Sequence, residues 1–389
     1  MKRIRTGIWG LSEVAQRLVM PLFQGSEMLV PPAFGSRWSQ RPGAVLDYQP
    51  PAIATLVAIG DSDKTRLERV AQICNAQTPY GNWRDMLREG ELDALLLTKA
   101  PEESLSDVFA EMARRGVRWL WLNFPPASSA DAILALSPQA AAHRIEVWWA
   151  QPASLLRAHR AAWQLMAHGK VGDVETVSLI WPAPFTLPST GNSHWWDIAQ
   201  AFNLSLKMAA AKETSQMTRV LQIMAGKTGD TVSIWARCAN DVTLNLRFGA
   251  ATPELPRMEI CLSEGRSLVC EAGQKLTQYA PRSEAITHNS SGWTTGDSGT
   301  LSGAYAEDLK RFLANCGELE SPSEHTHSDK KHLLWRSAAY VMQAMEGTGR
   351  SLNTRALEML PPLHQENLSP RVKDQVSPSQ NASATLPLE

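Results

Sequence analysis

The sequence lacks most of the signals that identify a function class directly. Its apolar runs stay short of the ~18 residues that a transmembrane helix requires. The segment after the basic start carries Glu13, Gln16 and Arg17, so it lacks the apolar centre of a signal peptide. A P-loop, a G-x-S-x-G elbow and an H-E-x-x-H motif are also missing. We therefore expect neither a membrane protein nor one of the enzymes that those motifs identify.

Cysteines are few, and no set of metal ligands has a recognisable spacing. The five cysteines are an odd number and include no C-x-x-C pair, which is typical of reduced thiols in a cytoplasmic protein. His325, His327 and His332 lie near Glu324 and Asp329, but their spacing fits no zinc motif. This cluster favours a solvated helix start over a zinc site, and we expect no bound metal.

Charge of either sign is balanced. The net charge is −1 at pH 7, with 20% charged and 43% hydrophobic residues, as in ordinary globular proteins. Since there is no basic surplus, we expect neither a nucleic-acid partner nor a membrane surface. At ~100–200 residues per domain, the chain has room for two domains.

The first half alternates short apolar strands with helices. Strands are expected at residues 3–9, 52–59, 92–98, 117–122 and 145–150, with helices between them. This alternation predicts an α/β domain over residues 1–152 with a doubly wound parallel sheet of the Rossmann type. Residues 25–51 are rich in Pro, Gly and Ser and are expected to form an insertion loop.

The second half reads as a separate α+β domain over residues 153–355. After a helix at residues 155–168, consecutive strand-like stretches predict an open, mainly antiparallel sheet, and two further helices follow it. From residue 356 onward, prolines among Ser, Asn and Gln predict a disordered tail that ends at residue 389.

The turn after the first strand, GIWGLSEVA over residues 7–15, is where a Rossmann fold holds a pyrophosphate. Gly10, Ser12 and Ala15 fall on the positions of G-x-G-x-x-G/A. Gly10 and Ala15 fit, but Ser12 adds a Cβ where the backbone should approach the phosphates, and Glu13 opposes a bound anion. The loop therefore supports the fold better than it supports cofactor binding.

Asp61, at the end of the second strand, has two interpretations. A carboxylate there can bond the ribose hydroxyls of NAD and repel the 2′-phosphate of NADP. It can also be a helix-capping residue within Gly60–Asp63, where Ser62 and Asp63 are further candidates for the cap. Its distance from the loop exceeds the usual ~20 residues because residues 25–51 intervene.

Several further stretches come in an order typical of one enzyme family. They are VAIGD (57–61), YGNWRDML (80–87), TKAPEES (98–104), LMAHGKVGDV (165–174) and AMEGTGR (344–350). Over residues 3–352 the chain resembles the Gfo/Idh/MocA (glucose-fructose oxidoreductase / inositol dehydrogenase / rhizopine-catabolism) family. The resemblance implies NAD or NADP as cofactor, a small sugar-like substrate, and a second sheet that often joins copies into homo-oligomers. The cofactor-contacting positions expected on the motifs above and on the LNFPPA turn (122–127) are Gly10, Ser12, Ala15, Asp61, Pro101, Asn123 and Pro125.

Two departures from the family concern its catalytic residues. Its E-K-P turn supplies an acid/base lysine, but alignment on Pro125 puts Phe124 at that position, and counting from Gly116 puts Asn123 there. Neither moves a proton near neutral pH. The family's D-x-x-x-H-x-x-D element matches residues 190–197, with Thr190 in place of the first carboxylate.

His194 and Asp197 of that element are retained. His194 can transfer a proton with Asp197 orienting it, or the pair simply starts a helix. Trp195 and Trp196 beside them can stack on a sugar-like ligand or pack in the core.

Two functions follow. One is a diverged oxidoreductase in which His194 is the proton donor and the cofactor carries the hydride. The other is a catalytically inactive family member, a pseudoenzyme that serves as a ligand-binding, regulatory or partner-binding scaffold. The overall resemblance favours the first, and the coincident changes at Ser12, at the lysine position and at Thr190 favour the second.

Overall fold

The computed structural model describes most of the two predicted domains. The described residues are 3–12, 15–20, 23, 54–74, 79–101, 104–169, 171–187, 195–212, 217–249, 256–288, 301–318 and 327–363. The predicted insertion loop at residues 25–51 and the tail after residue 363 lie outside these ranges. Within them, no helix is both long enough and apolar enough to cross a membrane.

The first half of the chain forms a six-stranded sheet in the order β3-β2-β1-β4-β5-β6. Every neighbouring pair is parallel, so the predicted doubly wound Rossmann sheet is confirmed. Its strand order reverses between β1 and β4, which is where such sheets bind ligands. The strands are β1 (Ile4–Trp9), β2 (Ala54–Gly60), β3 (Pro79–Tyr80), β4 (Ala94–Leu97), β5 (Trp119–Leu122) and β6 (Glu146–Trp149).

The helices between these strands begin where short polar side chains cap them. Ser104 and Ser129 each accept a backbone N–H of the first turn of α4 and α5. After the β1 loop the pattern predicts an α-helix over residues 12–24, but the structure has a π-helix there, in which the Met20 N–H donates to the Ala15 carbonyl at 2.8 Å. The helices are η1 (Ala15–Val19), α2 (Lys64–Cys74), α3 (Trp83–Glu89), α4 (Leu105–Arg114) and α5 (Ala130–Ala142).

The second sheet has nine strands in the order β14-β13-β12-β11-β7-β10-β9-β8-β15. Only β7 and β10 pair in parallel among these neighbours, so the predicted open, mainly antiparallel sheet is confirmed. The strands are β7 (Val174–Trp181), β8 (Val220–Thr228), β9 (Thr231–Cys238), β10 (Thr243–Phe248), β11 (Arg257–Leu262), β12 (Arg266–Glu271), β13 (Lys275–Tyr279), β14 (Ile286–His288) and β15 (Glu358–Met359).

Three features of this half differ from the prediction, and the first is that β13 and β14 extend the sheet beyond the last expected strand at residues 267–271. Glu358 and Met359 form β15 and pair with β8, so the segment expected to be a disordered tail from residue 356 includes an ordered strand. Leu360 and Leu363 are buried behind it, which explains why this part of the chain is held. Leu156 has an extended ψ of 136° and divides the helix expected over residues 155–168 into α6 (Pro152–Leu155) and α7 (Arg157–Ala167).

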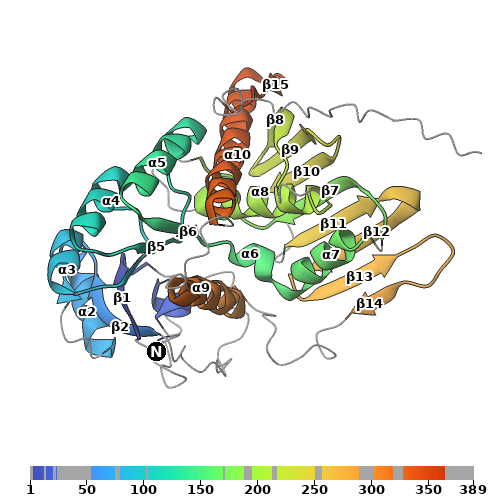
Figure 1. Cartoon of the computed structure of the whole chain (residues 1–389). Helices are drawn as coiled ribbons and strands as arrows, with labels where there is room; N and C mark the ends of the chain where they lie inside the picture. Colours follow the sequence, from blue (N-terminus) through green and yellow to red (C-terminus); the bar gives the residue numbers. More distant parts are fainter. Residues whose placement is uncertain are drawn as a thin grey trace, which may run out of the picture.

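Three long helices complete the fold around the two sheets. They are α8 (Trp195–Ala209), α9 (Leu301–Glu318) and α10 (His327–Thr354). Figure 1 shows α10 between α5 and the strands β8 to β10, and both α5 and β8 are in contact with it. Although α9 follows the second sheet in the chain, Tyr305 and Phe312 of this helix pack in one core with Ile8 and Trp121 of the first sheet.

Candidate functional site

The loop after β1 turns sharply at Gly10, at the carboxyl end of the first sheet. Gly10 has a φ of +85°, a conformation that strains any residue with a Cβ. A Cβ here would also collide with the side chain and backbone of Lys99. The Gly10 N–H donates to the Gly60 carbonyl at 2.8 Å and ties the loop to the end of β2. The turn therefore requires glycine at this fingerprint position.

The side chains of the other two fingerprint positions are used within the loop. The Ser12 Oγ accepts the Ala15 N–H at 3.3 Å, and the Ala15 methyl group is fully buried. Gln16 donates from Nε2 to the Leu11 carbonyl at 2.6 Å. The Ser12 hydroxyl thus helps to start η1, while Ala15 provides the close helix–strand packing that a small residue permits.

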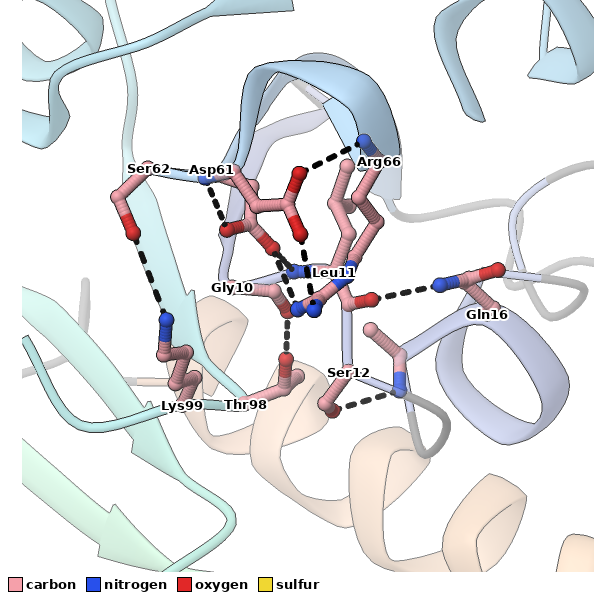
Figure 2. Close-up of polar contacts among 11 residues, drawn as sticks. Gly10, Leu11, Ser12, Gln16, Asp61, Ser62, Arg66, Thr98 and Lys99 are labelled. Atoms are coloured by element: carbon pink, nitrogen blue, oxygen red, sulfur yellow. Dashed lines mark hydrogen bonds and ion pairs between the residues drawn. The ribbon is translucent and has the colours of Figure 1, made fainter. Parts of the chain in front are cut away.

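Asp61 is fully buried, and donors of the protein surround its carboxylate (Figure 2). Its Oδ2 accepts the Leu11 N–H at 2.7 Å, and its Oδ1 accepts the Asp63 N–H at 2.9 Å. The guanidinium of Arg66 lies 3.3 Å from Oδ2. Asp61 therefore links β2, the loop and the start of α2, while Asp63 caps α2 by accepting the Arg66 N–H at 3.0 Å.

Lys99, on the turn after β4, reaches across the same edge of the sheet. Its Nζ donates to the Ser62 Oγ at 3.4 Å, and both side chains are exposed. The neighbouring Thr98 hydroxyl donates to the Gly10 carbonyl, so the Lys99 backbone lies directly against the loop (Figure 2). Pro101 follows on this turn and is partly buried. Sequence reasoning gave Lys99 no role, although it belongs to the TKAPEES stretch on which the family resemblance partly rests.

The position of the missing catalytic lysine is closed. Asn123 and Phe124 are both buried, and Pro125 is buried beside them. The Asn123 Oδ1 accepts a hydrogen bond of 2.8 Å from the hydroxyl of Tyr305 on α9. Burial, and next the charge of Asp197, raises the pKa of Tyr305 well above its ordinary value, so this phenol stays protonated. Sequence reasoning missed Tyr305 because no local motif surrounds it.

Asp197 lies in the first turn of α8, partly exposed but deep in the protein. Because the surrounding protein replaces most of its water, its pKa is raised to about 7. Thr190 and His194 lie outside the described residues. Trp195 and Trp196 are partly buried against the main hydrophobic core, which is the packing role expected as one alternative.

The buried carboxylate of Asp308 holds α9 against the first sheet. Asp308 accepts hydrogen bonds from the indole N–H groups of Trp121 at 2.8 Å and Trp148 at 3.1 Å, and from the Gln151 N–H at 3.2 Å. Burial raises its pKa to about 6 although these bonds favour the charged form. Asp308 thus fixes the helix that carries Tyr305.

Among the residues that the structure describes, no group of three or more His, Cys, Asp or Glu side chains has the arrangement of a metal centre. The cluster of His325, His327 and His332 lies outside the side chains described, although His327 begins α10.

Comparison with known proteins gives matches in structure only. No protein-family model and no curated protein sequence matches the chain. A dehydrogenase from Chromobacterium violaceum has a TM-score of 0.67 at 16% identity, over 91% of this chain and 97% of its own. An oxidoreductase from Agrobacterium radiobacter in complex with NAD+, L-tartaric acid and magnesium has a TM-score of 0.65 at 13% identity, over 92% and 98%. A myo-inositol 2-dehydrogenase from Lactobacillus plantarum has a TM-score of 0.64 at 13% identity, over 92% of this chain and 100% of its own. The chain therefore has the fold of Gfo/Idh/MocA-type oxidoreductases, which confirms the fold that the sequence resemblance predicts.

Proposed function

We propose that the chain is an NAD(P)-binding oxidoreductase that acts on a small, sugar-like alcohol or carbonyl compound. The observation that carries the proposal is the parallel Rossmann sheet with a tight glycine turn at its switch point. Asp197 adds an acid/base group, because its pKa, raised to about 7, lets it exist in both protonation states at neutral pH. It lies at the start of α8, near enough to Tyr305 for its charge to raise the pKa of that phenol. The phenol whose pKa this charge raises donates in turn to Asn123 at the carboxyl end of the first sheet.

Residues beside the β1 loop, at the ends of β2 and β4, fit an anionic dinucleotide. The tight turn at Gly10 brings backbone close to the switch point of the sheet, and Ser62 and Lys99 present exposed donors beside it. A bound nicotinamide would supply or accept the hydride. The chain's own residues then provide the proton step: His194 is the proposed donor, and Asp197, three residues later, holds its orientation or exchanges the proton with it.

The catalytically inactive alternative has an observation of its own in its favour. Asn123 and Phe124 fill the position of the family's lysine with buried side chains that carry no titrating group. On this alternative the chain still binds a nucleotide or another ligand but transfers no hydride. The two functions therefore differ in turnover and agree in binding.

Titration with NADH and NADPH, followed by nicotinamide fluorescence, tests the proposal first. We expect saturable binding, and no binding at millimolar cofactor would refute the oxidoreductase function. A panel of polyols and sugars with NAD+ or NADP+ then separates the two alternatives. Turnover that is lost in Asp197→Asn and kept in Asp230→Asn, an exposed turn carboxylate, supports the enzyme. Binding without turnover for any substrate supports the inactive form.

A further inference from the structure

The edge of the first sheet at β2 and β4 carries two cations and two carboxylates with different partners. Arg66 pairs with both carboxylates, at 3.3 Å from Asp61 and 3.1 Å from Asp63. Within the described part of the chain, Lys99 forms no ion pair, and its ammonium donates only to the Ser62 hydroxyl. Figure 2 shows Lys99 and Ser62 on one side of the loop, with Arg66 on the other side of Asp61.

In a Rossmann fold the residue that ends β2 faces the 2′ position of the adenosine ribose, where a free carboxylate selects NAD by repelling a 2′-phosphate. Asp61 does not present such a carboxylate. It is fully buried, two backbone N–H groups donate to it, and Arg66 neutralises its charge. The reason to expect exclusion of a 2′-phosphate is therefore absent. Ser62, the next residue, is the first exposed side chain after β2.

We infer that Ser62 and Lys99 form a binding pair for the 2′-phosphate of NADP(H), so that the chain prefers NADP(H) over NAD(H). This inference rests on the proposed dinucleotide binding. A hydroxyl and an ammonium 3.4 Å apart can both donate to one phosphate, and a phosphate monoester accepts several charge-assisted hydrogen bonds. Asp63 shares this edge, but its carboxylate pairs with the Arg66 guanidinium and also accepts the backbone N–H of Arg66.

The pyrophosphate of the cofactor is the other phosphate group that an ammonium at this edge could bind. The position of Lys99 favours the 2′-phosphate. Its ammonium contacts Ser62 at the end of β2, whereas the pyrophosphate position lies at Ser12 and the start of η1. A lysine that served the pyrophosphate would act equally on both cofactors. A lysine that serves the 2′-phosphate acts on NADP(H) alone.

The experiment measures calorimetric affinities of the full chain for adenosine 2′,5′-bisphosphate and adenosine 5′-monophosphate, and for NADPH and NADH. We expect the wild-type chain to bind each 2′-phosphorylated ligand at least about tenfold more tightly than its partner. Lys99→Gln should lower the affinity for the 2′-phosphorylated ligands about tenfold, and Ser62→Ala should lower it less. Both variants should bind NADH with an affinity within about twofold of the wild-type value. Lys227→Gln removes an exposed lysine on β8 and serves as the matched control.

Three outcomes would overturn the inference. Equal or tighter binding of NADH by the wild-type chain would mean that the 2′-phosphate is not recognised. An equal loss for NADPH and NADH in Lys99→Gln would place the ammonium at the pyrophosphate. Retention of full 2′-phosphate affinity in Lys99→Gln would remove the lysine from the site. Failure of every ligand to bind would instead refute the proposed function, so the two failures are distinguishable. Thermal unfolding of each variant verifies that it is folded.

Discussion

Asp197 changes its charge over a pH range in which most carboxylates stay ionised. In the folded chain it keeps its proton up to about pH 7, whereas an ordinary aspartate loses it near 3.8. The folded state therefore binds more protons between these values, and the free energy of unfolding falls as the pH rises through this window. Between about pH 5 and about pH 8, the free energy of unfolding should therefore fall by roughly 1–3 kcal/mol less in Asp197→Asn than in the wild-type chain. Urea unfolding at the two pH values measures this difference.

The control for this prediction is Asp230→Asn, which removes an exposed carboxylate. Asp308, with its own pKa raised to about 6, keeps its contribution in both variants. The decline is therefore reduced in Asp197→Asn and not abolished. An unchanged pH dependence in this variant would contradict the raised pKa of Asp197.

Single-residue contacts were predictable from the sequence only where they are local. Asp63 was one of the expected caps for α2, and it lies three residues from the N–H that it accepts. The bond from Tyr305 to Asn123 joins residues 182 positions apart, and no spacing rule reaches that far. Likewise, the sequence showed that Asp61 ends β2, but the inward orientation of its carboxylate depends on Leu11, 50 positions away.

At the scale of elements, the loop between β1 and η1 makes a testable demand on Gly10. Gly10→Ala combines a positive φ with a Cβ that collides with Lys99, whereas Gly116→Ala has a similar φ of +73° and open space around its Cβ. Gly116→Ala should thus lower the free energy of unfolding by roughly 1 kcal/mol, and Gly10→Ala by roughly 2–4 kcal/mol. Urea unfolding measures both, and equal losses would show that the contact with Lys99 relaxes freely.

Most helices and strands were predictable because apolar periodicity and capping residues lie within each element. β4 reads ALLL and is buried throughout, and β9 alternates between buried and partly exposed or exposed positions, as a strand with one covered face must. The π-helix after the loop was not predictable, since its hydrogen-bond pattern leaves no mark in the apolar spacing. β15 was missed because a two-residue strand exists only through its pairing with β8.

At the scale of the whole molecule, α9 makes the two sheets depend on each other. The helix follows the second sheet in the chain, yet Tyr305, Leu309 and Phe312 complete the core over the first sheet. α10 adds a second connection, because it contacts α5 on one side and β8 on the other. Division of the chain at residue 152 would therefore expose apolar surface of the first sheet, and we expect the described parts to unfold together.

Asp308 tests this dependence because it is the polar anchor of α9. Asp308→Ala would leave two indole N–H groups and the Gln151 N–H without their acceptor in a buried place. We expect a loss of roughly 2–4 kcal/mol in the free energy of unfolding, with a smaller loss for Asp308→Asn, which keeps one acceptor oxygen. Hydrogen exchange at increasing urea, read by mass spectrometry, follows β4 and β5 of the first sheet and β9 and β10 of the second sheet separately. If α9 couples the sheets, both sheets lose protection at the same lower urea midpoint in Asp308→Ala. Loss of protection in the first sheet at a lower urea concentration than in the second would show instead that the first sheet unfolds on its own.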